Sequence, residues 1–295
     1  MGQENSRFKR QKSQPKQQVT RATAATAMAS LQATPASSLP DTITGAMLQN
    51  CQRLGSAALG QVWRYDAHTV LKRSGPSPTA EAAAMRFVRE HTSIPVPKVL
   101  KSDANGYIFM EYVDGQPLDQ AWERLNSVQR KGIVDQLRGC LGELHAVSGS
   151  FIGSVDRSIC NDQLFENCES PYGPYADEAA FRKGMAQSLR ACGADPTWTD
   201  VVIGFIDAIP TGRRIVLTHG DFVPRNILVR DGRVVAIVDW EMAGFYPEYW
   251  EYAKAHFFAD YQHPWMRERV LDQIMTPFKL ELGLLLHTRK VFLEF

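Results

Sequence analysis

The segment of residues 215–241 constrains the fold of this chain more than any other part of the sequence. Its first three residues, Ile-Val-Leu, are β-branched or aliphatic and predict a strand. Gly220 then allows a sharp turn of the backbone. Two further apolar runs, 227–229 and 234–238, are separated by Arg-Asp-Gly-Arg, a sequence typical of a tight hairpin. The segment therefore predicts a strand, a polar loop and a β-hairpin that ends in acidic residues.

Polar side chains flank this hairpin in the sequence. Asn226 precedes it, with a further acid five residues earlier, and Asp239 follows it. If Val229 pairs with Val234, Asn226 lies opposite Ile237, so that Asn226 and Asp239 leave the hairpin at the same end. An amide oxygen and a carboxylate oxygen are ligands that suit a hard cation such as Mg²⁺. The sequence therefore predicts a magnesium site at this end of the hairpin.

The spacing of these polar residues resembles the catalytic segment of phosphotransferases with the kinase fold. A His-Gly-Asp triplet ending at Asp221 stands where that fold has His-Arg-Asp, and an Asp-Trp-Glu triplet beginning at Asp239 stands where it has Asp-Phe-Gly. Together with the continuation through residues 242–252, these motifs are similar to the aminoglycoside phosphotransferase family and to its eukaryotic phosphotransferase-like subgroup. The resemblance covers about residues 50–262.

This resemblance implies a fold, an activity and a set of roles. The fold would be α+β and bilobal, protein-kinase-like, with a small antiparallel-sheet N-lobe holding one helix and a larger, mainly helical C-lobe. The activity would be transfer of the γ-phosphate of ATP, with Mg²⁺, to a hydroxyl group of a small molecule. Asp221 would be the catalytic residue that orients the acceptor hydroxyl and accepts its proton, and Asn226 with Asp239 would hold the metal.

A lysine and a glutamate upstream are predicted to form an ion pair. Lys72 ends a predicted strand, and Glu81 lies in the helix predicted for residues 80–90. Glu81, Met85 and Val88 share one helical stripe, so the carboxylate lies on the apolar face and needs a cationic partner. Alternatively, Glu81 only complements the helix dipole from the first turn. The resemblance further implies that Lys72 binds the α- and β-phosphates of the nucleotide.

Two further segments of the first lobe would complete the nucleotide site. Gly55 and Gly60 enclose a run of small residues, whose backbone N–H groups would approach phosphate oxygens in a kinase-like fold; a plain glycine-containing hairpin is the alternative. Met110, Glu111 and Val113 stand at the end of the last predicted strand of this lobe. The resemblance implies that Met110 packs behind the adenine ring while the backbone of Glu111 and of Val113 hydrogen-bonds it.

The second lobe is predicted to be helical over residues 127–147, 181–189 and 199–209. Three glycines of the first helix are expected to allow close helix packing, at positions 132, 139 and 142. The aromatic side chains of residues 246–258 are predicted to belong to the core. By resemblance, Glu251 would brace the catalytic loop.

Charge and composition set the first residues apart. Residues 1–40 carry six basic side chains, one acid and few large apolar groups, and are predicted not to fold. The predicted organisation is a basic tail over 1–45, the N-lobe over 46–113 and the C-lobe over 114–295. Outside the first 40 residues there are 27 basic and 31 acidic side chains, which gives no reason to expect nucleic-acid binding.

Compartment is predicted from cysteine usage and from hydropathy. Five cysteines without a Cys-x-x-Cys pair argue against a disulfide framework and a zinc site, and no run of about 18 apolar residues is present. We therefore predict a cytoplasmic protein. The first six residues also fit the pattern for myristoylation at Gly2, with the basic cluster of residues 7–16 as a second, weak membrane signal. A chance match and a mitochondrial transit peptide are the alternatives.

Three functional interpretations stay open. The first is the small-molecule kinase described above. The second is a catalytically silent, kinase-like nucleotide-binding module, favoured by the imperfect glycine loop and by the short segment 280–295. The third, a protein kinase, is disfavoured because no activation segment ending in Ala-Pro-Glu follows Asp239.

Overall fold

The computed structural model describes residues 35–54, 61–73, 78–103, 106–165, 172–191, 195–257 and 259–293. The predicted acylation at Gly2 and the predicted unfolded tail up to residue 34 concern residues outside these ranges and stay predictions. The cytoplasmic location and the lobe boundaries also stay predictions. Among the described helices, none is both long and apolar enough to cross a bilayer.

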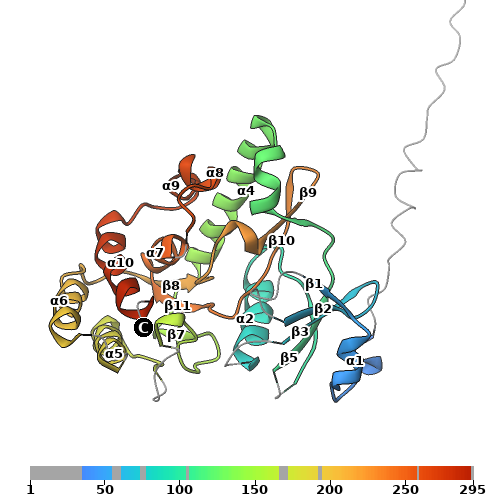
Figure 1. Cartoon of the computed structure of the whole chain (residues 1–295), viewed down its shortest axis with the longest axis horizontal. Coiled ribbons are helices and arrows are strands. Elements are labelled where there is room, and N and C mark those ends of the chain that lie inside the picture. Colours follow the sequence, from blue (N-terminus) through green and yellow to red (C-terminus); the bar gives the residue numbers. More distant parts are fainter. Residues whose placement is uncertain are drawn as a thin grey trace, which may run out of the picture. The chain divides into compact units, whose positions relative to one another are not determined.

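The smaller lobe is built on a five-stranded antiparallel sheet (Figure 1). Neighbouring strands follow the order β1-β2-β3-β5-β4. Because side chains alternate along a strand, Lys72 lies on the same face as Val70, Ile108 and Met110. The strands are β1 (Gln52–Leu54), β2 (Gln61–Arg64), β3 (Thr69–Arg73), β4 (Val99–Ser102) and β5 (Tyr107–Glu111).

Two different segments cover the faces of this sheet. Helix α2 (Pro78–His91) packs the buried side chains of Met85 and Val88 into the core that includes the Lys72 face. On the opposite face, η1 (Ala36–Ser38) and α1 (Gly45–Gln49) flank Leu39, which is only 4% exposed and packs in one cluster with Trp63. Leu39 lies within the range predicted to be an unfolded tail. The end of that range is therefore packed on the sheet, which its polar composition did not indicate.

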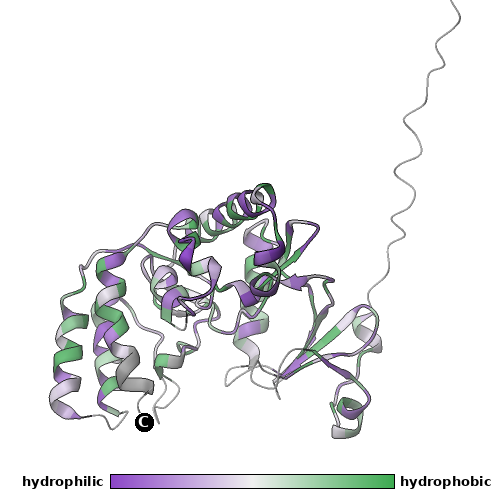
Figure 2. Ribbon diagram, turned by 45° about the horizontal axis from the view of Figure 1, so that its top comes forward, coloured by the Kyte–Doolittle hydropathy of each residue, from purple (hydrophilic) through white to green (hydrophobic). Residues whose placement is uncertain are grey.

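Helices dominate the larger lobe, as predicted. They are α3 (Leu118–Ala121), η2 (Trp122–Arg124), α4 (Ser127–Ala146), η3 (Gln163–Phe165), α5 (Glu178–Ala191), α6 (Pro196–Asp207), α7 (Trp250–Phe257), α8 (Pro264–Arg267), α9 (Val270–Ile274) and α10 (Lys279–Leu293). The helices at the left of Figure 2 carry both hydrophobic and hydrophilic bands, as expected for helices with one buried face.

Helix α4 begins at a capping box formed by Asn126 and Gln129, and its buried stripe includes Leu137 and Leu141. The expected role of its three glycines in close packing is wrong. A Cβ atom at position 132, 139 or 142 would meet nothing within 4 Å. These glycines lie off the buried stripe, since the stripe itself is filled by branched aliphatic residues.

Two small sheets support the predicted catalytic segment. Strands β10 (Arg233–Ile237), β9 (Ile227–Arg230) and β6 (Gln116–Pro117) form one, and strands β7 (Gly153–Ser154), β11 (Gly244–Pro247) and β8 (Ile215–Thr218) form the other. The sequence did not indicate β11, which exists through its antiparallel pairing with β8. The predicted core role of the aromatic segment is confirmed, because Tyr246, Tyr249 and Trp250 are all buried.

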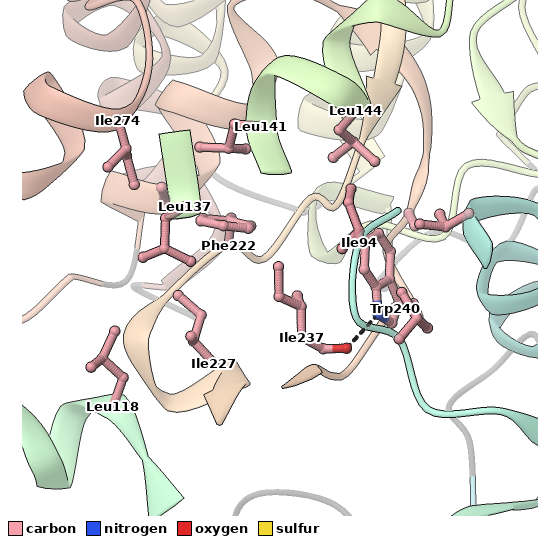
Figure 3. Packing of buried hydrophobic residues seen from close by; sticks show 14 of the residues in the cluster. Ile94, Leu118, Leu137, Leu141, Leu144, Phe222, Ile227, Ile237, Trp240 and Ile274 are labelled. Atoms are coloured by element: carbon pink, nitrogen blue, oxygen red, sulfur yellow. Dashed lines mark hydrogen bonds between the residues drawn. The ribbon is translucent and has the colours of Figure 1, made fainter. Parts of the chain in front are cut away.

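Trp240 lies at the centre of the main hydrophobic core, among residues of both lobes. Its side chain is 0% exposed, and its indole N–H donates to the carbonyl of Ile237 at 2.9 Å. Figure 3 shows the indole beside Ile94 and below Leu144 of α4. This packing fixes the backbone on either side of Trp240, which holds the two acids of the Asp-Trp-Glu triplet. The α+β, two-lobed fold predicted from the sequence is the fold observed.

Candidate active site

The loop between β8 and β9 carries the predicted catalytic aspartate. It turns at Gly220, whose φ of +79° lies in the left-handed region, and a Cβ there would meet the carbonyl oxygen of Met242 at 2.6 Å. Both facts require glycine at this position. The loop ends in η4 (Pro224–Asn226), from which the Asn226 amide Nδ2 donates to Asp221 Oδ2 at 2.7 Å. The local backbone therefore presents Asp221 beside Asn226.

Glu251 of α7 holds this loop through hydrogen bonds to its backbone. Its carboxylate accepts hydrogen bonds from the backbone N–H of His219 and, at 3.1 Å, from that of Gly220. Burial raises the pKa of Glu251 to about 7, although these two N–H donors act in the opposite direction. The contact implied by resemblance is thus present, across about 30 residues of sequence.

The predicted register of the hairpin is wrong by one residue. Val229 does pair with Val234, but the register shifts between Val234 and Ala236, where a β-bulge adds one residue to β10. Consequently the N–H of Val238, not Ile237, donates to the carbonyl of Asn226, at 2.9 Å. The bulge brings Asn226 opposite the residue that directly precedes Asp239, so the two predicted metal ligands emerge at the same end as expected.

The donor set at this end fits a hard cation. Asn226 uses its Nδ2 for Asp221, and its Oδ1 has no hydrogen-bond donor among the described residues. Asp239 adopts a left-handed φ of +68° and presents a carboxylate that is 32% exposed. Within the described ranges, no group of three or more His, Cys, Asp or Glu side chains is placed to hold a metal ion. The fit therefore rests on one amide and one carboxylate oxygen.

Lys72 connects the smaller lobe to Asp239. Its Nζ lies 2.8 Å from Glu81 Oε1 and 2.6 Å from Asp239 Oδ1, so the predicted pair with Glu81 is present. Glu81 is 1% exposed and lies in the first turn of α2. Burial alone would lower the pKa of Lys72, but the carboxylates of Glu81 and Asp239 raise it above its ordinary value. Conversely, Lys72 lowers the pKa of Asp239 against the opposing effect of burial.

A cavity of about 370 Å³ opens beside this ion pair. Its walls include Lys72, Glu81, Asn226 and Asp239, together with an apolar set made of Leu54, Val62, Val70, Met85, Pro97, Met110, Val113, Pro117, Leu228 and Val238. A mostly apolar lining with a few charged and polar groups is typical of sites that bind small molecules.

The predicted adenine-binding residues line the same cavity. Met110 is 7% exposed, and Glu111 and Val113 follow it along the wall. The N–H of Glu111 donates to the carbonyl of Lys98 at 2.9 Å, which leaves the Glu111 carbonyl as the group available to a base. The N–H of Val113 has no acceptor among the described residues. The predicted glycines Gly55 and Gly60 lie outside the described residues.

The sequence profile of one family, described as the phosphotransferase enzyme family, matches residues 50–274. The chain belongs to the phosphotransferase enzyme family. The family predicted from the sequence motifs is confirmed.

Solved structures share the fold of this phosphotransferase. The streptomycin–ATP ternary complex of the aminoglycoside phosphotransferase APH(2")-IIa has a TM-score of 0.54 and 12% sequence identity, covering 79% of this chain and 82% of that chain. A putative fructosamine-3-kinase from Thermobifida fusca has a TM-score of 0.55 and 18% identity, covering 83% of this chain and 87% of that one. The bilobal, kinase-like architecture is therefore confirmed.

A curated relative is larger than this phosphotransferase. The chain is 25% identical over 202 residues to the probable acyl-CoA dehydrogenase IBR3 of Arabidopsis thaliana. The match covers 64% of this chain but spans only 24% of the length of that protein. The dehydrogenase name therefore applies to that whole protein.

The sequence interpretation missed three polar residues of the candidate site. Arg225 bonds Asp221 and lines the cavity, and Glu241 Oε2 lies 3.8 Å from Lys72 Nζ. Both residues lie in the segment 215–241, and their charges could have marked them as candidate site residues. Asn161, whose side-chain amide donates to the carbonyl of Glu241, lies 80 residues away and gave no signal.

Proposed function

We propose that this phosphotransferase transfers the γ-phosphate of ATP to a hydroxyl group of a small molecule, with Mg²⁺ as metal cofactor. The observation that carries the proposal is that Lys72, Asn226 and Asp239 all line the 370 Å³ cavity, with Asp221 hydrogen-bonded to Asn226. Further support comes from the similar structure of APH(2")-IIa, which is a ternary complex with streptomycin and ATP.

In this proposal the cavity holds the nucleotide by three kinds of contact. Its apolar walls, including Met110, contact the base, while the carbonyl of Glu111 and the N–H of Val113 hydrogen-bond its edge. Lys72 donates to phosphate oxygens and is kept in place by Glu81, at 2.8 Å. A fixed ammonium group stabilises charge without first having to reorganise.

Asn226 and Asp239 would hold the metal. Asn226 Nδ2 bonds Asp221, while Oδ1 receives no hydrogen bond from the residues that the structure describes, and Asp239 would share its carboxylate between Lys72 and the cation. When bound, Mg²⁺ would supply positive charge that offsets the negative charge developing on the phosphate group.

Asp221 would position the acceptor. Its carboxylate accepts a hydrogen bond from the substrate hydroxyl and takes the proton as the hydroxyl oxygen bonds to phosphorus and the bond from phosphorus to the ADP oxygen breaks. Glu251 keeps the loop that carries Asp221 in one conformation through its bonds to His219 and Gly220.

Asp239→Ala tests the metal site. In the parent chain, ATP with Mg²⁺ should raise the melting temperature, and chelation of Mg²⁺ should remove most of this shift. The variant should fold but lose the Mg²⁺-dependent part of the shift. Asp231→Asn, at the exposed tip of the same hairpin, is the matched control and should behave like the parent. An unchanged shift in Asp239→Ala would contradict the assignment.

Asp221→Asn separates the enzyme from a silent nucleotide-binding module. The amide keeps the shape but cannot accept the proton, a change expected to lower turnover roughly 10²- to 10⁴-fold. Product formation from a library of hydroxylated small molecules, or slow ATP hydrolysis, is measured in parent and variant. A silent module would bind nucleotide and show no turnover in either chain. Equal, nonzero turnover in both would disprove the role of Asp221.

A further inference from the structure

Arg225 carries a charge within the catalytic loop to which the proposed mechanism gives no role. It lies in η4, four residues after Asp221. Its Nη2 donates to both carboxylate oxygens of Asp221, at 3.0 and 2.9 Å. The carboxylate proposed to receive the acceptor hydroxyl is therefore paired with a guanidinium group in this structure.

Arg225 also lines the cavity proposed for the nucleotide. Among the described lining residues, Lys72 and Arg225 are the two with cationic side chains. Lys72 is already bonded to two carboxylates, those of Glu81 and Asp239. A nucleoside triphosphate brings several negative charges into this cavity, and Arg225 is positioned to bind some of its phosphate oxygens.

The guanidinium of Arg225 has donors to spare. Only Nη2 is hydrogen-bonded; Nε and Nη1 have no acceptor among the described residues. The side chain is 31% exposed and is thus reachable from the open part of the site. An arginine presents five N–H donors in a planar fork that matches two oxygens of a phosphate group.

We propose that Arg225 is a phosphate-binding residue that changes partners when ATP binds, an inference that rests on the proposed function. In the nucleotide-free enzyme it pairs with Asp221. With ATP bound, its guanidinium binds the γ-phosphate and leaves the Asp221 oxygens to the acceptor hydroxyl. As the acceptor oxygen bonds to phosphorus and ADP leaves, the hydroxyl proton passes to Asp221, and Arg225 keeps its own protons while it stabilises charge on the transferred group.

This exchange has a functional consequence. Without a γ-phosphate, the guanidinium of Arg225 occupies both carboxylate oxygens of Asp221, which the acceptor hydroxyl would need. With the γ-phosphate present, the same charge moves to the group that reacts. Arg225 thereby couples the readiness of Asp221 to the presence of ATP rather than ADP.

Nucleotide affinity without any acceptor tests the proposal. Dissociation constants of ATP and ADP, each with Mg²⁺, are measured by calorimetry on the full chain. Arg225→Ala should weaken ATP binding roughly 10- to 100-fold, the effect of a lost charge-assisted hydrogen bond, and ADP binding by less than about 3-fold. Arg225→Lys keeps the charge without the fork and should give an intermediate loss. Arg233→Ala, exposed on the same hairpin and outside the cavity lining, should change neither affinity.

A second background removes an ambiguity. Arg225→Ala also uncovers the charge of Asp221, which would itself repel a γ-phosphate. The measurement is therefore repeated with Asp221→Asn present in both chains. If Arg225 binds the phosphate, its removal still weakens ATP more than ADP in this background. If Arg225 only masks Asp221, the selective loss disappears, and the proposal is wrong.

The remaining outcomes are also decisive. Equal losses of ATP and ADP affinity in Arg225→Ala would mean that Arg225 serves the fold of the site and does not select the γ-phosphate. If circular dichroism shows that Arg225→Ala is unfolded, Arg225→Lys decides, and parent-like discrimination between ATP and ADP in that variant and in Arg225→Gln would overturn the proposal. A parent chain that binds neither nucleotide would instead refute the proposed function itself.

Discussion

Replacing Lys72 by methionine should destabilise the protein far more than the loss of one surface charge. The Lys72 side chain is 9% exposed and that of Glu81 is 1% exposed, and their charged atoms lie 2.8 Å apart. At an effective dielectric constant of about 20, two unit charges at this distance attract each other by about 6 kcal/mol. Most of that gain offsets the desolvation of the two groups, so the net value of the intact pair is small.

In the single variant Lys72→Met, the attraction between the two charges no longer offsets the desolvation of Glu81. Lys72→Met takes the ammonium group of Lys72 away from the buried carboxylate of Glu81, and breaking a buried ion pair on one side costs about 3–5 kcal/mol of the free energy of unfolding. The double variant Lys72→Met with Glu81→Met removes both charges and replaces them by flexible apolar side chains. Asp239 also loses a partner, but its 32% exposed side chain can be hydrated. We therefore expect the double variant to lie within about 1–2 kcal/mol of the parent.

Urea denaturation of the parent, the two single variants and the double variant gives the four free energies of this cycle. The reasoning requires the double variant to be more stable than Lys72→Met alone. A double variant that is less stable than Lys72→Met, or a single variant within about 1 kcal/mol of the parent, would refute it. Met is matched in length to Lys, so a loss of packing alone does not account for the expected difference.

Three further predictions concern the loop and the core. Burial raises the pKa of Glu251 from 4.5 to about 7; a carboxyl group with a raised folded pKa contributes stability that is present while it is protonated and lost as pH rises through that window. The free energy of unfolding of the parent should therefore fall relative to that of Glu251→Gln between about pH 4.5 and 7, and a constant difference in urea denaturation over that range would contradict this. Gly220→Ala should lower the free energy of unfolding by several kcal/mol and reduce nucleotide-dependent turnover, because the new Cβ meets a carbonyl oxygen at 2.6 Å. Gly212 has a φ of +80° and open space around it, so Gly212→Ala should lower the free energy of unfolding by only about 1–2 kcal/mol. Equal losses of stability in thermal or urea denaturation of the two variants would exclude the steric explanation. Trp240→Ala should remove about 3–5 kcal/mol, since the indole is fully buried, and a loss below about 1 kcal/mol would show that the core around it closes.

Sequence patterns were informative wherever the structure is decided over a few residues. The Asp-Gly turn predicted a hairpin, and the spacing of Glu81 with Met85 and Val88 predicted a carboxylate on the buried side of a helix. The pairing of Val229 with Val234 was correct for the residues next to the turn. Each of these features depends on periodicity or on the backbone preferences of adjacent residues, which the sequence expresses directly.

Features that depend on distant residues could not be predicted in this way. The bulge in β10 shifts the register beyond the turn, β11 exists only through its pairing with β8, and Leu39 is buried only because a sheet face is there to receive it. Arg225 and Asp221 both lie in the motif, so their contact could have been considered from the sequence, but its geometry depends on the turn of η4.

The sequence by itself determined which chemical groups this protein has and their order along the chain: a lysine, a buried glutamate, and an Asp, Asn, Asp set around a hairpin. Tertiary structure decided which of them meet. Lys72 and Asp239 lie 167 residues apart in sequence and 2.6 Å apart in space, a contact that exists because the core around Trp240 joins the two lobes. Hydrophobic burial, which is non-directional, drives that association, and the shapes of the packed side chains set where the charges come to lie.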